Sequence, residues 1–307
     1  MFAFQNRTAT ATSSLVALTL ALCWVNPAVA EVENAGEAPV AILIPPVPPE
    51  AAPATFSVTV RAGERVSDFC KRLEKTRISG CTELDALGKN KGKFQGYAFL
   101  GSATGLKRFE GAFVPGQYRF LVQHQEEDSS DLLSERIVSR LLAIANSRFT
   151  KLTRTGLSLR EKVILASVVE KEAVSKTSHG EIASVFMNRL TKRQPLGSCP
   201  TVEYALGYHR PFLLFSDVRI DSPYNVYKRK GLPPTPIAFF SDEAWNAVQS
   251  PPKTRNEFFV YDWTNGKVSF ARTYGEHTNN ANRARRNFVQ KFGYKKMYEK
   301  VPGKFYE

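Results

Sequence analysis

The clearest periodic pattern of hydrophobic and polar positions lies in residues 158–173, SLREKVILASVVEKEA. Apolar residues recur there at steps of three and four, which predicts an amphipathic helix. Ser158 followed by Glu161 fits a capping box and places the start of this helix. One face of this helix is largely apolar but includes a carboxylate, that of Glu170. The residues of this face are Val163, Ala166, Ser167, Glu170 and Val174.

Glu170 is the candidate functional residue of this helix. A carboxyl group held against apolar side chains tends to have a raised pKa and can act as a general acid near neutral pH. Glu172 lies about 200° further round the helix, at about 100° per residue, and is not expected to pair with Glu170. On the helix pattern alone, a structural role at the edge of the apolar stripe is the more common explanation for Glu170.

A second helix is predicted over residues 181–193, after a polar turn at His179-Gly180. Pro195 ends it, and Lys192 and Arg193 suit the negative end of its dipole. Helices joined by so short a turn are expected to pack antiparallel, which places Asn188 and Arg189 against the helix that carries Glu170.

The region before these helices begins with an alternating strand at 56–60, a turn at 62–64 and an amphipathic helix at 66–75. A second short helix is expected near 82–87. This order resembles a LysM-like carbohydrate-binding module, so we expect one over residues 55–95.

The remaining elements belong to a larger unit over residues 96–307. Residues 109–120 contain aromatics separated by Gly and Pro and predict an irregular strand and turn in an aromatic core. Residues 131–147 predict an amphipathic supporting helix. Alternating residues around Thr264-Asn265-Gly266 predict a hairpin, and 279–291 a basic closing helix. The expected fold class is therefore α+β.

The N-terminus predicts export. Residues 1–30 combine Arg7, an apolar run at 15–25 and the small-x-small site Ala28-Val29-Ala30, as in a signal peptide. The run is about 11 residues long, against about 20 for a spanning helix, which favours cleavage over an uncleaved membrane anchor. Residues 31–54 are rich in Ala and Pro and predict an extended linker. We expect the protein in the periplasm or at the outer face of the cytoplasmic membrane.

The composition of the chain limits the classes of binding partner that are expected. Removal of Arg7 with the signal leaves 41 basic and 29 acidic residues, a net charge of +12, which favours an anionic partner. Export and the lack of interleaved aromatic and basic residues argue against nucleic acid. Cys70 and Cys81 could pair in an oxidising compartment, whereas the four histidines show no metal-ligand spacing, so no metal is expected.

Six blocks of sequence, in this order, closely resemble the MltG/YceG-like endolytic transglycosylases of bacterial peptidoglycan. They are LASVVEKEA (165–173), SVFMNRL (184–190), SCPTVEYALG (198–207), DSPYNVY (221–227), GLPPTPI (231–237) and TYGEHTNNA (273–281).

The resemblance implies a lytic transglycosylase with a larger YceG-like catalytic domain. Such an enzyme cleaves the bond between N-acetylmuramic acid and N-acetylglucosamine in nascent glycan strands and leaves anhydro-muramyl ends. The first Glu of the V-E-K-E block, Glu170 in this chain, is taken as its catalytic residue. One carboxylate suffices, because the C6 hydroxyl of the sugar is the nucleophile: Glu170 would act as acid, then as base. No cofactor is required, and cell-wall synthases are candidate partners.

The other blocks are expected to form the walls of the glycan-binding cleft. Relatives usually have Asp where Cys199 stands, which leaves the specificity of this chain open. For each proposed cleft residue, local structural hydrogen bonding is as good an explanation as substrate binding. The candidate substrate-binding residues are Asn188, Arg189, Ser198, Thr201, Tyr224, Asn225, Tyr227 and His277.

Two other functions remain open at this point. The protein could be a non-catalytic peptidoglycan-binding protein, in which the LysM-like module binds and the large domain is a scaffold. It could also be a muramidase that hydrolyses the same bond. Hydrolysis normally needs a second carboxylate, for which Glu203 and Asp221 are the candidates.

Overall fold

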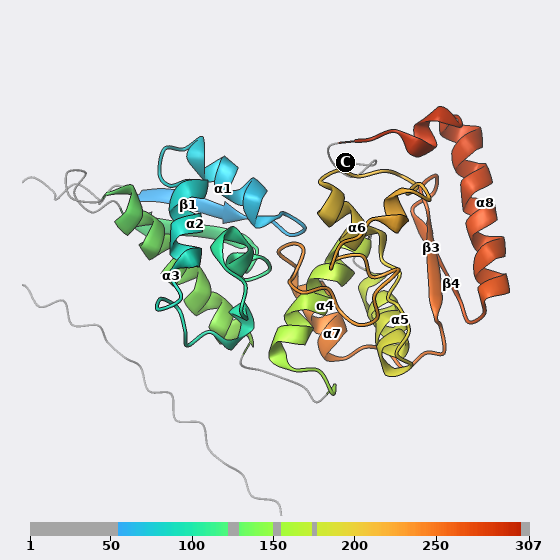
Figure 1. The fold of residues 1–307 in the computed structure, drawn as a ribbon, viewed down its shortest axis with the longest axis horizontal. Coiled ribbons are helices and arrows are strands. Elements are labelled where there is room, and N and C mark those ends of the chain that lie inside the picture. The colour runs from blue at the N-terminus through green and yellow to red at the C-terminus, as the bar shows by residue number, and fades with distance from the viewer. Residues whose placement is uncertain (1–54, 122–128, 150–154, 174–176, 302–307) are drawn as a thin grey trace, which may run out of the picture. The chain divides into compact units, whose positions relative to one another are not determined.

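The computed structural model describes residues 55–121, 129–149, 155–173 and 177–301 (Figure 1). The predicted signal peptide and linker, residues 1–54, lie outside the described residues. The described chain is mixed α+β, as expected. Its helices are α1 (Val66–Glu74), α2 (Cys81–Lys89), α3 (Ser130–Phe149), α4 (Leu159–Glu172), α5 (His179–Thr191), α6 (Cys199–Leu206), α7 (Asp242–Gln249) and α8 (Tyr274–Phe292). Its strands are β1 (Thr55–Val60), β2 (Gly116–Leu121), β3 (Phe258–Asp262) and β4 (Lys267–Ala271).

The first sheet joins segments that are far apart in the sequence. Strand β1 pairs antiparallel with β2, from Thr55 opposite Leu121 to Val60 opposite Gly116. The partner of β1 therefore lies beyond residue 95, where the expected LysM-like module ends. A disulfide between Cys70 and Cys81 links α1 to α2, a pairing that the sequence had left open.

Aromatic residues fill the core around α1, as the pattern of residues 109–120 predicts. The ring of Phe69 meets Phe113 and Phe239 edge-on, with centroids 5.6 Å and 5.8 Å away. Phe109 and Phe113 are fully buried and stack on each other at 5.8 Å. The segment that follows β1 is thus packed directly against the loop that precedes α7.

Helix α4 is the central element of the larger part of the chain. Both hydrogen bonds of the predicted capping box form: Ser158 Oγ accepts from the N–H of Glu161, and the Glu161 side chain accepts from the N–H of Ser158. The helix packs against α5, α6 and α7 (Figure 1). Every residue from Lys162 to Val169 is buried, so α4 has no solvent face over this stretch.

The C-terminal hairpin is confirmed. Strands β3 and β4 pair antiparallel, with Asp262 opposite Lys267, and Gly266 has a φ of +71°, a conformation that glycine adopts without strain. The closing helix starts earlier than expected, at Tyr274 rather than residue 279. Its capping box, formed by Thr273 and Glu276, went unused in the prediction.

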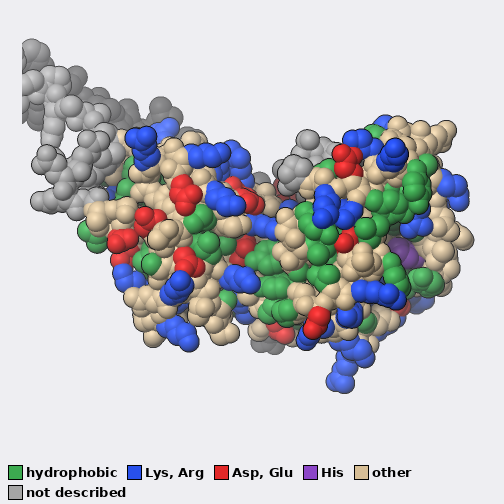
Figure 2. All heavy atoms as spheres, turned by 45° about the horizontal axis from the view of Figure 1, so that its top comes forward, with side chains coloured by type: hydrophobic (Ala, Val, Ile, Leu, Met, Phe, Trp, Pro, Cys, Tyr) green, Lys and Arg blue, Asp and Glu red, His purple; other side chains and the backbone are tan. Residues whose placement is uncertain are grey.

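No helix within the described ranges is both long and apolar enough to cross a membrane. On the face shown in Figure 2, Lys and Arg side chains are spread widely, with Asp and Glu between some of them, rather than gathered into one patch. The basic charge of the chain therefore does not define a single binding surface on this face.

Candidate active site

A cleft of the described chain has a volume of about 1030 Å³ and is built from several distant segments. The turn between β1 and α1 forms one wall, and α5 with the loop after it, α6, β3 and the start of α8 contribute others. The end of α4 brings two carboxylates to this cleft, Glu170 and Glu172. The turn at Gly63 is held in place by backbone hydrogen bonds to Phe239 and by Lys171 Nζ, which donates to the Gly63 carbonyl.

Glu170 is bound into the structure by the N-terminus of α7. Both the backbone N–H and the hydroxyl of Ser241 donate to Glu170 Oε2, at 3.0 Å and 2.6 Å, and His179 Nε2 lies 3.7 Å away. Burial alone would raise the pKa of Glu170, but the nearby His179 ring and the two hydrogen bonds from Ser241 outweigh it and lower the pKa. The expectation of a raised pKa at Glu170 is therefore wrong, because a residue 71 positions later satisfies the carboxylate.

The pKa of Glu172 is shifted in the opposite direction from that of Glu170. It is partly buried at the junction of α4 and α6, where Ser198 Oγ donates to its Oε1 at 2.7 Å and the Cys199 N–H also donates. Burial and the negative charge of Glu203 raise the pKa of Glu172 to about 7, against the opposing effects of these hydrogen bonds and of Arg189. Such a carboxyl group can both donate and accept a proton near neutral pH.

Arg189 forms part of the wall next to Glu172. Its Nε donates to the Glu257 carbonyl at 2.6 Å, its Nη1 donates to the Leu196 carbonyl, and its guanidinium lies over the Phe258 ring at 5.1 Å. Gly197 allows this packing. A Cβ at Gly197 would lie 2.8 Å from Arg189 Nη1, and the φ of +60° there also favours glycine.

Aromatic rings also line the cleft. His277 stacks on Phe258 with centroids 5.3 Å apart, and Trp263 lies edge-on to Tyr261 at 5.2 Å. Burial, followed by the charge of Arg189, lowers the pKa of His277, which favours the neutral form of this ring. Tyr227 lines the cleft as well, with its hydroxyl 3.0 Å from Cys199 Sγ. Flat apolar rings beside polar groups are suited to binding pyranose rings.

Of the sequence-predicted residues, Glu170, Arg189, Tyr227 and His277 line the cleft, and Ser198 contacts Glu172. The other four hold the fold together and do not line it. Asn188 donates to the carbonyls of Thr254 and Asn256; Thr201 to that of Ser198; Asn225 to those of Val218 and Ile220; and the hydroxyls of Tyr224 and Thr235 share a hydrogen bond.

Of the two candidates for a second carboxylate, only Glu203 lines the cleft. Asp221 does not line the cleft; its side chain is 92% exposed and lies 3.5 Å from Arg229. Glu203 does line the cleft, on α6. Within the described residues no group of three or more His, Cys, Asp or Glu side chains is arranged to hold a metal ion.

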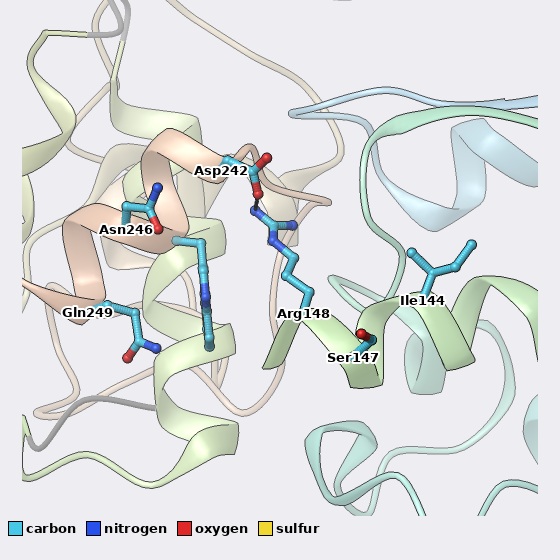
Figure 3. A pocket seen from close by; sticks show the side chains of 7 residues that line it. Ile144, Ser147, Arg148, Asp242, Asn246 and Gln249 are labelled. Atoms are coloured by element: carbon cyan, nitrogen blue, oxygen red, sulfur yellow. Dashed lines mark ion pairs between the residues drawn. The ribbon is translucent and has the colours of Figure 1, made fainter. Parts of the chain in front are cut away.

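A second, smaller pocket of about 640 Å³ lies where the end of α3 meets α7 (Figure 3). Arg148 points from α3 toward Asp242 on α7, and the two form an ion pair at 2.6 Å. The guanidinium of Arg148 also packs over the Phe240 ring at 5.3 Å. The acidic residue that lines this pocket is already paired with Arg148, and we take the Arg148–Asp242 contact as a link between two helices.

Comparison with known proteins identifies the family. Residues 42–283 match the sequence model of the YceG-like family. The chain belongs to the YceG-like family. The crystal structure of a YceG-like protein from Listeria monocytogenes shares its fold, with a TM-score of 0.63 and 28% identity, over 73% of this chain and 75% of that one.

Curated YceG-like relatives carry a functional name. A Bacillus subtilis protein named endolytic murein transglycosylase is 36% identical over 184 residues, which cover 59% of this chain and 48% of the relative. A Streptococcus pneumoniae protein of the same name is 32% identical over 178 residues, 56% of this chain and 32% of the relative. The matched part thus spans about half of the first relative and about a third of the second.

Proposed function

We propose that this YceG-like protein is an endolytic lytic transglycosylase of peptidoglycan. It would cleave the bond between N-acetylmuramic acid and N-acetylglucosamine within nascent glycan strands and leave 1,6-anhydro-muramyl ends. Family membership and the names of the relatives support this function. The cleft adds independent support, since it combines a proton donor with aromatic and polar walls in a volume of about 1030 Å³.

The observation that carries the proposal is the environment of Glu172. It lines the cleft, its carboxyl group is oriented by Ser198, and its pKa of about 7 lets it exchange a proton at neutral pH. Glu170 remains the alternative acid from sequence, but Ser241 already binds its carboxylate and its pKa is lowered. We therefore assign the acid role to Glu172, the second Glu of the V-E-K-E block.

The reaction needs one carboxyl group used twice. Protonated Glu172 gives its proton to the glycosidic oxygen as the bond from the anomeric carbon to that oxygen breaks, which leaves an oxocarbenium-like centre. The C6 hydroxyl of the same sugar then attacks the anomeric carbon, and its proton passes to the Glu172 carboxylate. Water is not consumed, no cofactor takes part, and the intramolecular attack benefits from a high effective concentration.

The walls of the cleft would position the sugar. Trp263 and Tyr227 are suited to contact pyranose faces, and Arg189 is placed to attract the carboxylate of a lactyl-peptide substituent. The turn between β1 and α1 lines the same cleft, so the proposed LysM-like region would contact the strand near the cleavage site.

We further propose export to the periplasm or the outer face of the cytoplasmic membrane, directed by the predicted signal in residues 1–30; only the alternative of an uncleaved segment would attach the protein to the membrane. The disulfide between Cys70 and Cys81 supports this location, because such bonds persist in oxidising compartments. Cell-wall synthases remain candidate partners, and nucleic acid is not expected.

The test is the chemistry of the product ends. Uncrosslinked glycan strands are incubated with residues 31–307, and the fragments are analysed by mass spectrometry. Internal fragments ending in anhydro-muramyl groups, lighter by one water than hydrolysed ends, are expected. Reducing ends would instead indicate a muramidase that uses Glu203 as its second carboxylate. Binding of sacculi without release of fragments would indicate a peptidoglycan-binding protein.

A further inference from the structure

Glu203 and His209 form a second polar unit of the cleft that the proposed reaction does not use. The His209 Nδ1–H donates to Glu203 Oε1 at 2.7 Å, and the Arg210 N–H lies 3.4 Å from the same oxygen. Both side chains are nearly buried, and both residues line the cleft. The carboxylate of Glu203 is therefore held in position, in the same cleft that Glu172 lines.

The position of Glu203 on α6 explains why its negative charge acts on the carboxyl group of Glu172. The N-terminus of α6 holds the Glu172 carboxyl through the Ser198 hydroxyl and the Cys199 N–H. Glu203 follows Cys199 by four residues, so it lies on the same face of the helix, with Cβ atoms about 6 Å apart. A negative charge one helical turn away disfavours the ionised form of Glu172.

The surroundings of His209 keep this pair rigid. The backbone of His209 exchanges two hydrogen bonds with Val301, and its ring lies 5.6 Å from that of Trp263. Arg65 reaches from the turn before α1 and donates to the Glu203 carbonyl at 3.3 Å. Segments from both ends of the described chain therefore hold Glu203 and its partner His209 in position.

We propose that Glu203, held by His209, is a positioning residue that keeps Glu172 in its protonated, proton-donating form in the empty cleft. The proposal rests on the proposed function. Other groups act on Glu172 as well: Ser198 and the Cys199 N–H stabilise its anion from α6, and Arg189 does so from α5. Glu203 supplies the opposing charge. After the proton has left, repulsion from Glu203 favours its return from the C6 hydroxyl, which supports the second step too.

The test compares pH profiles of kcat/KM on uncrosslinked glycan strands for the unmodified protein, Glu203→Gln, Glu203→Asp and His209→Asn. Glu203→Gln is expected to move the alkaline limb of kcat/KM to lower pH by roughly half a pH unit or more, the order that Coulomb's law gives for the loss of a nearby charge in a watery medium. At pH 8 this corresponds to a loss of about threefold. Glu203→Asp keeps the charge, and the Asn side chain can still donate to Glu203, so both are expected to stay near the unmodified limb.

The proposal would be overturned if the alkaline limb of kcat/KM in Glu203→Gln stayed where it is in the unmodified protein while activity fell equally at every pH. Glu203 would then have only a structural role. NMR titration of the Glu172 carboxyl carbon supplies a readout that does not need activity. The midpoint is expected to fall in Glu203→Gln, and an unchanged midpoint would also overturn the proposal. If the unmodified protein cleaves no strands, the proposed function fails, while this titration still decides whether Glu203 acts on Glu172.

Discussion

Ser198 Oγ donates a hydrogen bond of 2.7 Å to Glu172 Oε1. This contact joins the last turn of α4 to the start of α6 and orients the carboxyl group that we assign as the catalytic acid. It also stabilises the ionised form of Glu172, in opposition to burial and to Glu203. Several contacts therefore set the pKa of about 7, and removal of one of them should move it in a known direction.

We expect Ser198→Ala to move the alkaline limb of kcat/KM upward by about one pH unit, because the Glu172 anion loses a hydrogen bond worth about 1.5 kcal/mol. The pH dependence of strand cleavage measures this. Ser184→Ala is the matched control: Ser184 is a buried serine on α5, hydrogen-bonded to Thr254 outside the cleft. A downward shift with Ser198→Ala would contradict the assigned environment of Glu172.

Glu110 is expected to make the stability of the fold depend on pH. It is buried, accepts hydrogen bonds from the Val66 N–H and the Tyr204 hydroxyl, and burial raises its pKa to about 7 from an ordinary 4.5. Because the folded-state pKa is the higher one, its contribution is fully present below pH 4.5 and is lost as pH rises through 7.

Glu110→Gln should therefore increase the free energy of unfolding relative to the unmodified protein by about 1–3 kcal/mol at pH 8, and by much less at pH 5. Denaturant unfolding at the two pH values tests this. An equal difference at both pH values would show that the charge of Glu110 is not the cause.

The disulfide between Cys70 and Cys81 should contribute to stability but not to catalysis. It closes a short loop between α1 and α2, and neither cysteine lines the cleft. We expect the double variant Cys70→Ala, Cys81→Ala to lose about 3 kcal/mol of unfolding free energy. Its kcat/KM, measured below its melting temperature, should stay within about twofold of the unmodified value. A much larger loss of activity would show that the disulfide shapes the wall formed by the turn at Gly63.

Local sequence patterns predicted the elements whose ends are determined by nearby residues. The capping box at Ser158 and the turn at Asn265-Gly266 depend on contacts within a few positions, and both form as expected. The aromatic core around Phe113 also followed from the sequence, whereas the sequence left open whether Cys70 and Cys81 are joined. The capping box at Thr273 is also visible in the sequence. The predicted start of α8, placed at the basic segment from residue 279, is therefore too late.

The choice between Glu170 and Glu172 could not be made from the helix pattern. That pattern assumes one buried and one exposed face, whereas α4 is packed on all sides, so the side opposite the apolar stripe is also an interior position. The pKa of Glu170 depends on Ser241 and that of Glu172 on Ser198 and Glu203, all distant in sequence. Likewise, Asn188 and Asn225 resemble ligand-binding residues in the sequence, but their amides satisfy backbone carbonyls that only the fold brings near.

The most direct test of the central assignment compares Glu172→Gln with Glu170→Gln in the release of anhydro-muramyl fragments from uncrosslinked strands, followed by mass spectrometry. We expect Glu172→Gln to fold normally and to release no fragments. Glu170→Gln should lose about 1–3 kcal/mol of unfolding free energy, because a poorer acceptor then faces the two donors of Ser241, yet still release fragments when folded. A stable Glu170→Gln protein without activity, beside an active Glu172→Gln protein, would contradict the assignment and return the acid role to Glu170.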